Sequence, residues 1–415
     1  MLRRRQPLDE ALRHHLGEGG RLAPLAPRDR AFARLLAATV LRRLGQIDDA
    51  LARCLERPLA GRAKAAEPAL RLGAAQLLFL NTPPHAAVDG AVRQIRRQPK
   101  LSGLVNAVLR RLAREGAGIV AGQDAERLNC PDWLWHAWAA AYGEERTRAL
   151  VSRMLVEPPL DLGLKPEAKA WAARLGAVAL PTGGLRLAAG GPVEDLPGYR
   201  QGVWWVQDAA AALPARLLGE VADRRVLDLC AAPGGKTLQL AAAGARVTAL
   251  DRSESRLDLV RRNLERCGLA AELIAADLLS WRPETRFELI LLDAPCTATG
   301  TIRRHPDIWR LKAAADVAEM AAVQRQLAES ALAMLAPGGI LVFGTCSLQP
   351  EEGEAIAEAL LAAHPNLRRR AVEPAEIGGL GELVSPAGDL RTLPCHLAEA
   401  GGLDGFYACR FASNA

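Results

Sequence analysis

The stretch DLCAAPGGKT, residues 228–237, decides the fold of the larger part of this chain. It closes the apolar run 226–230 and opens a helical segment, so a strand, a glycine-containing turn and a helix follow one another. This order places backbone N–H groups around a ligand at the beginning of a helix. A P-loop would need glycine at position 230, where the chain has Cys230, and the glycine spacing of a dinucleotide-binding turn is also absent. The turn therefore predicts a ligand-binding α/β domain of neither of these types.

Apolar runs and helical segments alternate from about residue 206 to the end. Strands are expected at 226–230, 247–250, 273–275, 289–292 and 340–343, and helices at 236–243, 253–267, 316–336 and 352–363. Short, wholly apolar strands that alternate with helices are typical of a doubly wound, mostly parallel sheet. We therefore predict a Rossmann-like α/β domain over residues 206–415.

Two regions with other patterns precede this domain. Residues 1–125 read as helical throughout and contain 22 Lys and Arg against 11 Asp and Glu, whereas the rest of the chain has 31 against 36. This asymmetry favours an all-α domain that faces a polyanion, although a solvated basic surface would carry the same charge. Residues 126–205 have a mixed pattern and predict a small α+β linker domain that begins with a helix over 133–154.

The composition excludes several classes of protein. The 415 residues are 50% hydrophobic and 24% charged, as in globular proteins of two or three domains. No run of about 18 apolar residues predicts a membrane span, and the basic start lacks the apolar run of a signal peptide, so we expect a cytoplasmic protein. The eight cysteines form no C-x-x-C pair, so neither a metal site nor a disulfide framework is expected. The oligomeric state is left open, with a monomer as the default.

Acidic residues close successive predicted strands. Asp251, Asp277 and Asp293 end the second, third and fourth strands, and Asp228 lies near the end of the first. A single aspartate at a strand end is commonly a turn or cap residue. Several of them beside a glycine turn suggest a ligand with ribose, amine and cationic groups. S-adenosyl-L-methionine has these groups and carries no phosphate.

Two strands also end in cysteine at what should be the same edge. Cys296 follows the strand 289–292, and Cys346 follows the strand 340–343. A single cysteine is most often an inert core residue. Two at equivalent strand ends favour chemistry, because a thiolate is the natural nucleophile for an electron-poor ring carbon once its pKa is lowered.

Together these motifs resemble the signature of the RNA 5-methylcytosine methyltransferases. The resemblance rests on the turn 228–237, DAPC at 293–296, IRRHPD at 302–307 and TCS at 345–347. The first 125 residues, with GLVNAVLR at 103–110, resemble the NusB-type RNA-binding domain. The pairing is similar to the subgroup of small-subunit rRNA methyltransferase B, also called Sun or Fmu, over nearly the whole chain.

The resemblance implies a role for each matching residue. Cys346 would attack C6 of a flipped cytosine in 16S rRNA, Cys296 would assist release after methylation of C5, and Asp293 could bind the cytosine edge. S-adenosyl-L-methionine would be held by Cys230, Ala231, Ala232, Pro233, Gly234, Gly235, Lys236, Asp251, Asp277 and Asp293.

Two departures from the family pattern concern contacts with the substrate. Thr297-Ala298 stands where relatives usually have serine and glycine. Gly163-Leu164-Lys165 stands where relatives commonly have arginine, valine and asparagine.

Two alternatives stay open on the sequence. The same chemistry on tRNA would make the chain a tRNA cytosine-C5 methyltransferase. A NusB-like RNA-binding factor with an inert methyltransferase domain is the alternative from another class, and the presence of both Cys296 and Cys346 argues against it. We interpret the chain as a 16S rRNA cytosine-C5 methyltransferase.

Overall fold

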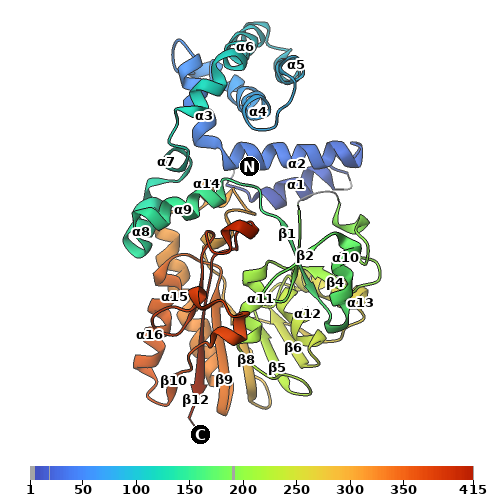
Figure 1. Ribbon diagram of the computed structural model, residues 1–415, viewed down its shortest axis with the longest axis vertical. Helices are drawn as coiled ribbons and strands as arrows, with labels where there is room; N and C mark the ends of the chain where they lie inside the picture. Colours follow the sequence, from blue (N-terminus) through green and yellow to red (C-terminus); the bar gives the residue numbers. More distant parts are fainter. Residues whose placement is uncertain (1–4, 18, 189–191, 415) are drawn as a thin grey trace. The chain divides into compact units, whose positions relative to one another are not determined.

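The computed structural model describes residues 5–17, 19–188 and 192–414, which form two compact units (Figure 1). Unit 1 comprises Met1–Val156 and Ile302–Lys312, and unit 2 comprises Glu157–Thr301 and Ala313–Ala415. The chain therefore passes from one unit to the other three times. The divisions predicted at residues 125 and 205 differ from these bounds, because helices of 126–156 pack on the N-terminal helices and the small sheet that follows packs on helices of unit 2.

Unit 1 is helical in its described residues, as predicted. Its core contains the fully buried side chains of Ile47, Leu70 and Leu109. The helices are α1 (Leu8–Leu16), α2 (Pro27–Arg42), α3 (Leu44–Cys54), η2 (Gly61–Ala66), α4 (Glu67–Leu78), α5 (Pro84–Ile95), α6 (Pro99–Ala121), α7 (Ala125–Asn129), α8 (Asp132–Tyr142), α9 (Glu144–Met154) and α14 (Ile308–Leu311).

The single helix predicted over 133–154 is two helices. Gly143 separates α8 from α9, and its φ of 83° lies in the left-handed region that favours glycine. The apolar periodicity continues across this break, which is why the pattern alone did not show it.

The segment 302–312 completes unit 1 although it lies far along the sequence. Trp309 is 1% exposed and packs against Trp138, with ring centroids 6.0 Å apart. The carboxylate of Asp307 accepts the backbone N–H of Leu8 at 3.0 Å. These contacts make a piece of chain that lies between two segments of unit 2 in the sequence an integral part of the helical unit.

Unit 2 contains the predicted doubly wound sheet. In its described residues the strand order is β10-β12-β9-β8-β5-β6-β7, with β11 paired to β12. The five strands from β9 to β7 in this order run parallel, and the pairs made by β12 are antiparallel. The strands are β5 (Arg225–Leu229), β6 (Arg246–Asp251), β7 (Glu272–Ala275), β8 (Phe287–Asp293), β9 (Leu335–Thr345), β10 (Leu367–Arg369), β11 (Leu390–Thr392) and β12 (Phe406–Ser413).

Helices cover both faces of this sheet, which explains why its parallel strands are wholly apolar. Successive residues of β5, such as Val226 and Leu227, are fully buried in two separate cores on opposite faces of the sheet. The helices of unit 2 are α10 (Trp171–Leu175), α11 (Ala209–Arg216), α12 (Gly235–Ala242), α13 (Glu254–Cys267), α15 (Ala314–Ala333) and α16 (Glu354–Ala363).

A small antiparallel sheet precedes the large one in the chain. Its order is β2-β3-β1-β4, formed by β1 (Leu160–Leu164), β2 (Val178–Ala179), β3 (Leu185–Leu187) and β4 (Trp204–Val206). The carboxylate of Asp161 in β1 forms a buried ion pair with Arg186 at 2.6 Å and accepts the N–H of Ala209 at 3.0 Å. Because Ala209 begins α11, this carboxylate attaches the small sheet to the helical layer of the large one.

Candidate active site

The predicted site residues gather at the carboxyl edge of the parallel strands. Strand β5 lies between β6 and β8, so the chain order reverses direction at the β5–β8 boundary. Ligands of doubly wound sheets bind in the crevice at such a switch point. The turn 230–234 leaves β5 on one side of this point, and the loop from Asp293 to Cys296 leaves β8 on the other.

The turn after β5 brings backbone close to neighbouring chain. Gly234 has a φ of 102°, and a β-carbon at this position would come within 2.9 Å of Val260. Helix α12 begins at the next residue, and its N-terminus receives no side-chain cap from a described residue. Its first N–H groups and the positive end of the helix dipole therefore suit a carboxylate. Burial raises the pKa of the Cys230 thiol to about 12, so this wall of the turn is neutral at pH 7.

Asp251 is fixed between two backbone groups. The residue is 3% exposed, and its carboxylate accepts the N–H of Ala232 at 3.1 Å and that of Ser253 at 3.0 Å. It thus ties the turn 230–234 to the end of β6, as a structural cap would. Two carboxylate oxygens offer about four acceptor positions, so two remain for ribose hydroxyls.

Asp277 and Asp228 differ sharply in exposure. Asp277 is exposed, and one of its oxygens accepts the N–H of Leu279 at 2.9 Å. Asp228 is fully buried, and one oxygen accepts the Thr237 hydroxyl at 2.6 Å while the other has no hydrogen-bond partner among the described residues. Burial raises the pKa of Asp228 to about 7.

Lys236 and Asp293 join the two loops that flank the switch point. The Lys236 ammonium lies 2.6 Å from the Asp293 carboxylate and 4.7 Å from the centre of the Phe406 ring. Lys236 is buried, whereas the Asp293 side chain is 31% exposed. Both residues are predicted for the site from the sequence, but their ion pair is not, because 57 positions separate them.

The two predicted catalytic cysteines lie side by side. The Sγ atoms of Cys296 and Cys346 are 3.4 Å apart, close enough for a thiol hydrogen bond, and both thiols are free. The hydrogen bond with Cys346 and then burial raise the pKa of Cys296 well above its ordinary value. The geometry therefore keeps the proton on Cys296.

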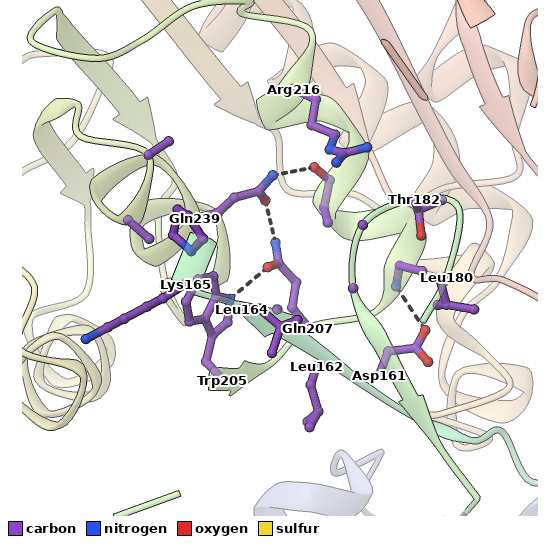
Figure 2. Close-up of a pocket in the computed structure, with 18 residues that line it drawn as sticks. Asp161, Leu162, Leu164, Lys165, Leu180, Thr182, Trp205, Gln207, Arg216 and Gln239 are labelled. Atoms are coloured by element: carbon purple, nitrogen blue, oxygen red, sulfur yellow. Dashed lines mark hydrogen bonds between the residues drawn. The ribbon is translucent and has the colours of Figure 1, made fainter. Parts of the chain in front are cut away.

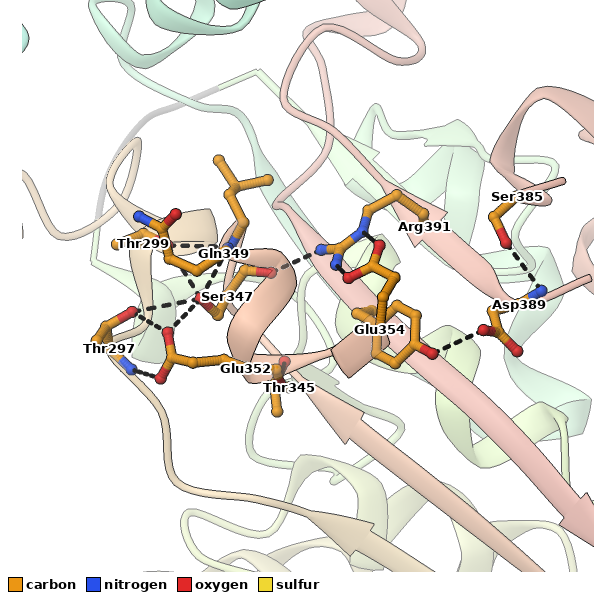
Figure 3. Close-up of polar contacts among 12 residues, drawn as sticks. Thr297, Thr299, Thr345, Ser347, Gln349, Glu352, Glu354, Ser385, Asp389 and Arg391 are labelled. Atoms are coloured by element: carbon orange, nitrogen blue, oxygen red, sulfur yellow. Dashed lines mark hydrogen bonds and ion pairs between the residues drawn. The ribbon is translucent and has the colours of Figure 1, made fainter. Parts of the chain in front are cut away.

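A buried carboxylate that the sequence did not single out lies behind the cysteines. Glu352 ends the short helix η6 (Pro350–Glu352), and its side chain accepts hydrogen bonds from Thr297 and Ser347, the residues that follow the two cysteines (Figure 3). The pattern PEEGE at 350–354 offered no way to tell which glutamate is buried.

A cavity of about 190 Å³ in unit 2 is lined by other residues. It lies against β1 and β4 of the small sheet and against α11 and α12. A hydrogen-bonded chain from the Trp205 indole through Gln207 to Gln239 crosses its wall, with distances of 2.8 and 3.0 Å (Figure 2). The predicted cofactor and catalytic residues lie outside its lining.

A surface hollow on unit 1 carries basic side chains. It lies between α5 and α6, and Arg110, Arg114 and His85 are among the residues that line it. Both arginines are exposed. This hollow lies within the first 125 residues, which resemble the NusB-type RNA-binding domain, and it includes Asn106 and Arg110 of the stretch 103–110.

Two searches of the described residues gave negative results. Over 5–17, 19–188 and 192–414, no three His, Cys, Asp or Glu side chains are grouped so that they could hold a metal ion. Within the same ranges, no helix combines the length and the apolar character needed to cross a membrane.

The fold and the edge chemistry define unit 2 as a Rossmann-like methyltransferase domain. S-adenosyl-L-methionine fits the residues present, because its ribose hydroxyls suit the carboxylate of Asp251 and its sulfonium and ammonium groups suit those of Asp277 and Asp293. Its carboxylate suits the uncapped start of α12. The family model of 16S rRNA methyltransferase RsmB/F matches residues 215–412, and the NusB family model matches residues 2–114.

Relatives with the same organisation share much of the sequence. Ribosomal RNA small subunit methyltransferase B of Vibrio cholerae is 36% identical, over 85% of this chain and 86% of that protein. The protein of the same name from Sodalis glossinidius is 38% identical over 88% of both chains. The chain belongs to the ribosomal RNA small subunit methyltransferase B family, whose methyl donor is S-adenosyl-L-methionine. The crystal structure of PH0851 has the same fold, with a TM-score of 0.74 and 20% identity over 99% of this chain and 98% of that one.

Proposed function

We propose that this protein methylates C5 of a cytosine in 16S rRNA through a covalent bond between Cys346 and C6 of the base. The observation that carries the proposal is the pair of thiols, 3.4 Å apart, at the ends of the neighbouring strands β8 and β9. The names of the relatives and of the family model support rRNA as the substrate.

Cys346 is the nucleophile in this proposal. The hydrogen bond between the thiols and the burial of Cys296 raise the pKa of Cys296, which favours its protonated form and makes Cys296 the poorer nucleophile. A thiolate is the reactive form of cysteine. Its sulfur bonds to C6, and the electron pair of the C5–C6 double bond moves to C5.

The methyl group then joins C5. When bound, S-adenosyl-L-methionine supplies an electrophilic methyl group on its sulfonium sulfur. Asp293 accepts a hydrogen bond from the amino group of the cytosine, and Lys236 holds the carboxylate in place at 2.6 Å. The base must leave its stack to reach these side chains.

Release of the product is assigned to Cys296. After methylation C5 still carries its hydrogen, and removal of this proton re-forms the double bond while the bond between C6 and the Cys346 sulfur breaks. The largest contribution to the raised pKa of Cys296 is its hydrogen bond with Cys346. That contribution ends when the Cys346 sulfur is bonded to carbon, so Cys296 becomes able to act as the base at the step where a base is needed.

Unit 1 is proposed to dock the RNA. We assign RNA binding to residues 1–125, a linking role to 126–205 and catalysis to 206–415. The excess of basic residues before position 125 and the match to the NusB family support the first assignment. A ribosomal substrate also supports a cytoplasmic location for the protein.

Two single substitutions test the covalent mechanism. Cys346→Ala should abolish both methylation and the RNA adduct, whereas Cys296→Ala should permit attack and methyl transfer but stall release. The substrate in this assay is labelled 16S rRNA from a strain lacking this methyltransferase. The stalled species should appear as a slowly migrating labelled band on a denaturing gel. The same assay with tRNA separates the two RNA classes.

The opposite pattern would reject the assignment. If the adduct survives in Cys346→Ala and disappears in Cys296→Ala, Cys296 is the nucleophile. If neither variant changes turnover by more than about tenfold, the covalent mechanism is wrong for this protein.

A further inference from the structure

The carboxylate of Glu352 accepts four hydrogen bonds and is fully buried. Its Oε1 accepts the backbone N–H of Thr297 at 2.8 Å and the side-chain amide of Gln324 at 3.1 Å. Its Oε2 accepts the hydroxyl of Ser347 at 2.5 Å and the hydroxyl of Thr297. Every acceptor position of the carboxylate is therefore in use.

The donors come from the two turns that carry the cysteines. Thr297 directly follows Cys296, and Ser347 directly follows Cys346. The carbonyl of Glu352 also accepts the hydroxyl of Thr345, the residue before Cys346, at 3.1 Å. One residue thus contacts the chain on both sides of Cys346 and on the far side of Cys296.

The side chain of Glu352 is held by the two cysteine turns and by Gln324 of α15. All four donors to Glu352 are neutral, so its burial is compensated by hydrogen bonds without an ion pair. An apolar side chain of similar volume would leave these four donors without an acceptor. A carboxylate, in contrast, accepts from both turns at once and holds them at a defined distance.

An amide could not do the same. Glutamine has one acceptor oxygen, and its NH₂ group would face two of the four donors. If the amide nitrogen faced the hydroxyls, both would have to turn to accept; if it faced the backbone N–H of Thr297, the contact would be repulsive. Glu352→Gln therefore keeps the size of the side chain and removes half of its acceptors.

We propose that Glu352 is a positioning residue that sets the separation of the Cys296 and Cys346 sulfur atoms by binding both cysteine turns. It touches neither substrate nor cofactor in this assignment. The consequence for the reaction rests on the proposed function, but the consequence for the distance between the thiols does not.

The first test measures the thiol pair without any reaction of the enzyme. Dibromobimane becomes strongly fluorescent when it bridges two neighbouring thiols, and the full-length wild-type protein should react at the Cys296–Cys346 pair. Subtraction of the signal from Cys296→Ser/Cys346→Ser isolates this pair from the other cysteines. Glu352→Gln and Ser347→Ala should each lower the rate of bridging at least fivefold.

Two further variants control this experiment. Glu351→Gln changes the neighbouring, exposed glutamate and should bridge at the wild-type rate. Thr297→Ser retains the hydroxyl that Thr297→Val removes, so it should restore bridging relative to Thr297→Val. Unchanged affinity for S-adenosyl-L-methionine, measured by calorimetry, shows that each variant is folded. Wild-type bridging in folded Glu352→Gln and Ser347→Ala would overturn the proposal.

The second test concerns turnover. If the proposed function is correct, Glu352→Gln should lower kcat for methyl transfer at least tenfold at unchanged KM for RNA, because the thiols and not the binding surfaces are displaced. A rise in KM at unchanged kcat would overturn the positioning role in the reaction. If the wild-type protein does not methylate 16S rRNA, the proposed function is rejected. The rate of thiol bridging then still tests whether Glu352 sets the separation of the two sulfur atoms.

Discussion

The buried aspartate at the end of β5 should make the stability of unit 2 depend on pH. Burial raises the pKa of Asp228 to about 7 in the folded protein, from an ordinary value of 3.8 for an aspartate side chain. Between these two values the folded state holds a proton that the unfolded chain has released. The free energy of unfolding therefore falls as pH rises through this window and is lowest above pH 7.

The substitution Asp228→Asn removes this proton-linked contribution. One pKa unit corresponds to about 1.4 kcal/mol, so the whole window corresponds to at most about 4 kcal/mol. Between pH 5.5 and pH 8 the wild-type protein should lose about 2 kcal/mol relative to the variant. Asparagine can still accept the hydrogen bond from the Thr237 hydroxyl, which donates to Asp228 at 2.6 Å. Any other effect of the substitution on the free energy of unfolding is therefore the same at both pH values.

Hydrogen–deuterium exchange measures this difference in unit 2 alone. Peptides covering β5 and β8 report the opening free energy of the sheet after correction for the intrinsic exchange rate at each pH. The opening free energy of wild type minus that of Asp228→Asn is compared between pH 5.5 and pH 8. An equal difference at the two pH values would show that the Asp228 carboxylate is ionised throughout, and the reasoning from burial would be refuted.

Three other outcomes are expected. Asp251→Ala should lower the affinity for S-adenosyl-L-methionine at least about tenfold in calorimetry, because charge-assisted hydrogen bonds contribute about 1.5–3 kcal/mol each; wild-type affinity would leave Asp251 with its cap role alone. Trp309→Ala should lower the stability of unit 1 by about 3–5 kcal/mol, measured by exchange in α8, because the side chain is 1% exposed; a change below about 1 kcal/mol would mean that the site collapses around the cavity. The double charge reversal Arg110→Glu/Arg114→Glu should weaken binding of 16S rRNA and lower the dependence on salt, whereas Arg325→Glu on α15 should not; equal effects would indicate nonspecific attraction.

The parallel half of the large sheet was predictable because each of its strands is buried on both faces. Burial of that kind leaves a continuous apolar run, as in 226–230, and the polar residues that follow the runs necessarily meet at one edge. The prediction that Cys296 and Cys346 share this edge is confirmed by the 3.4 Å between their sulfur atoms. Their roles, and those of the cofactor residues, stay predictions.

Features that depend on partners distant in sequence were not predictable. The antiparallel strands β10 to β12 lack a regular alternation with helices, and nothing local indicates that β12 pairs with β9. The sequence shows Glu352 as one of several glutamates after a proline, and its burial depends on donors up to 55 positions away. Pairing of Lys236 with Asp293 has the same origin, because it follows from the juxtaposition of β5 and β8.

The inclusion of residues 302–312 in unit 1 has a consequence for synthesis on the ribosome. Domains generally fold in the order in which they emerge, the N-terminal one first. Here the helices that end at Met154 lack the packing of Trp309 and the hydrogen bond from Leu8 to Asp307 until the chain has grown beyond residue 312. At about 5–20 residues per second that interval lasts on the order of 10–30 s. During it the face of Trp138 that packs against Trp309 is uncovered. The core of the helical unit is therefore completed only after strands β5 to β8 have been made.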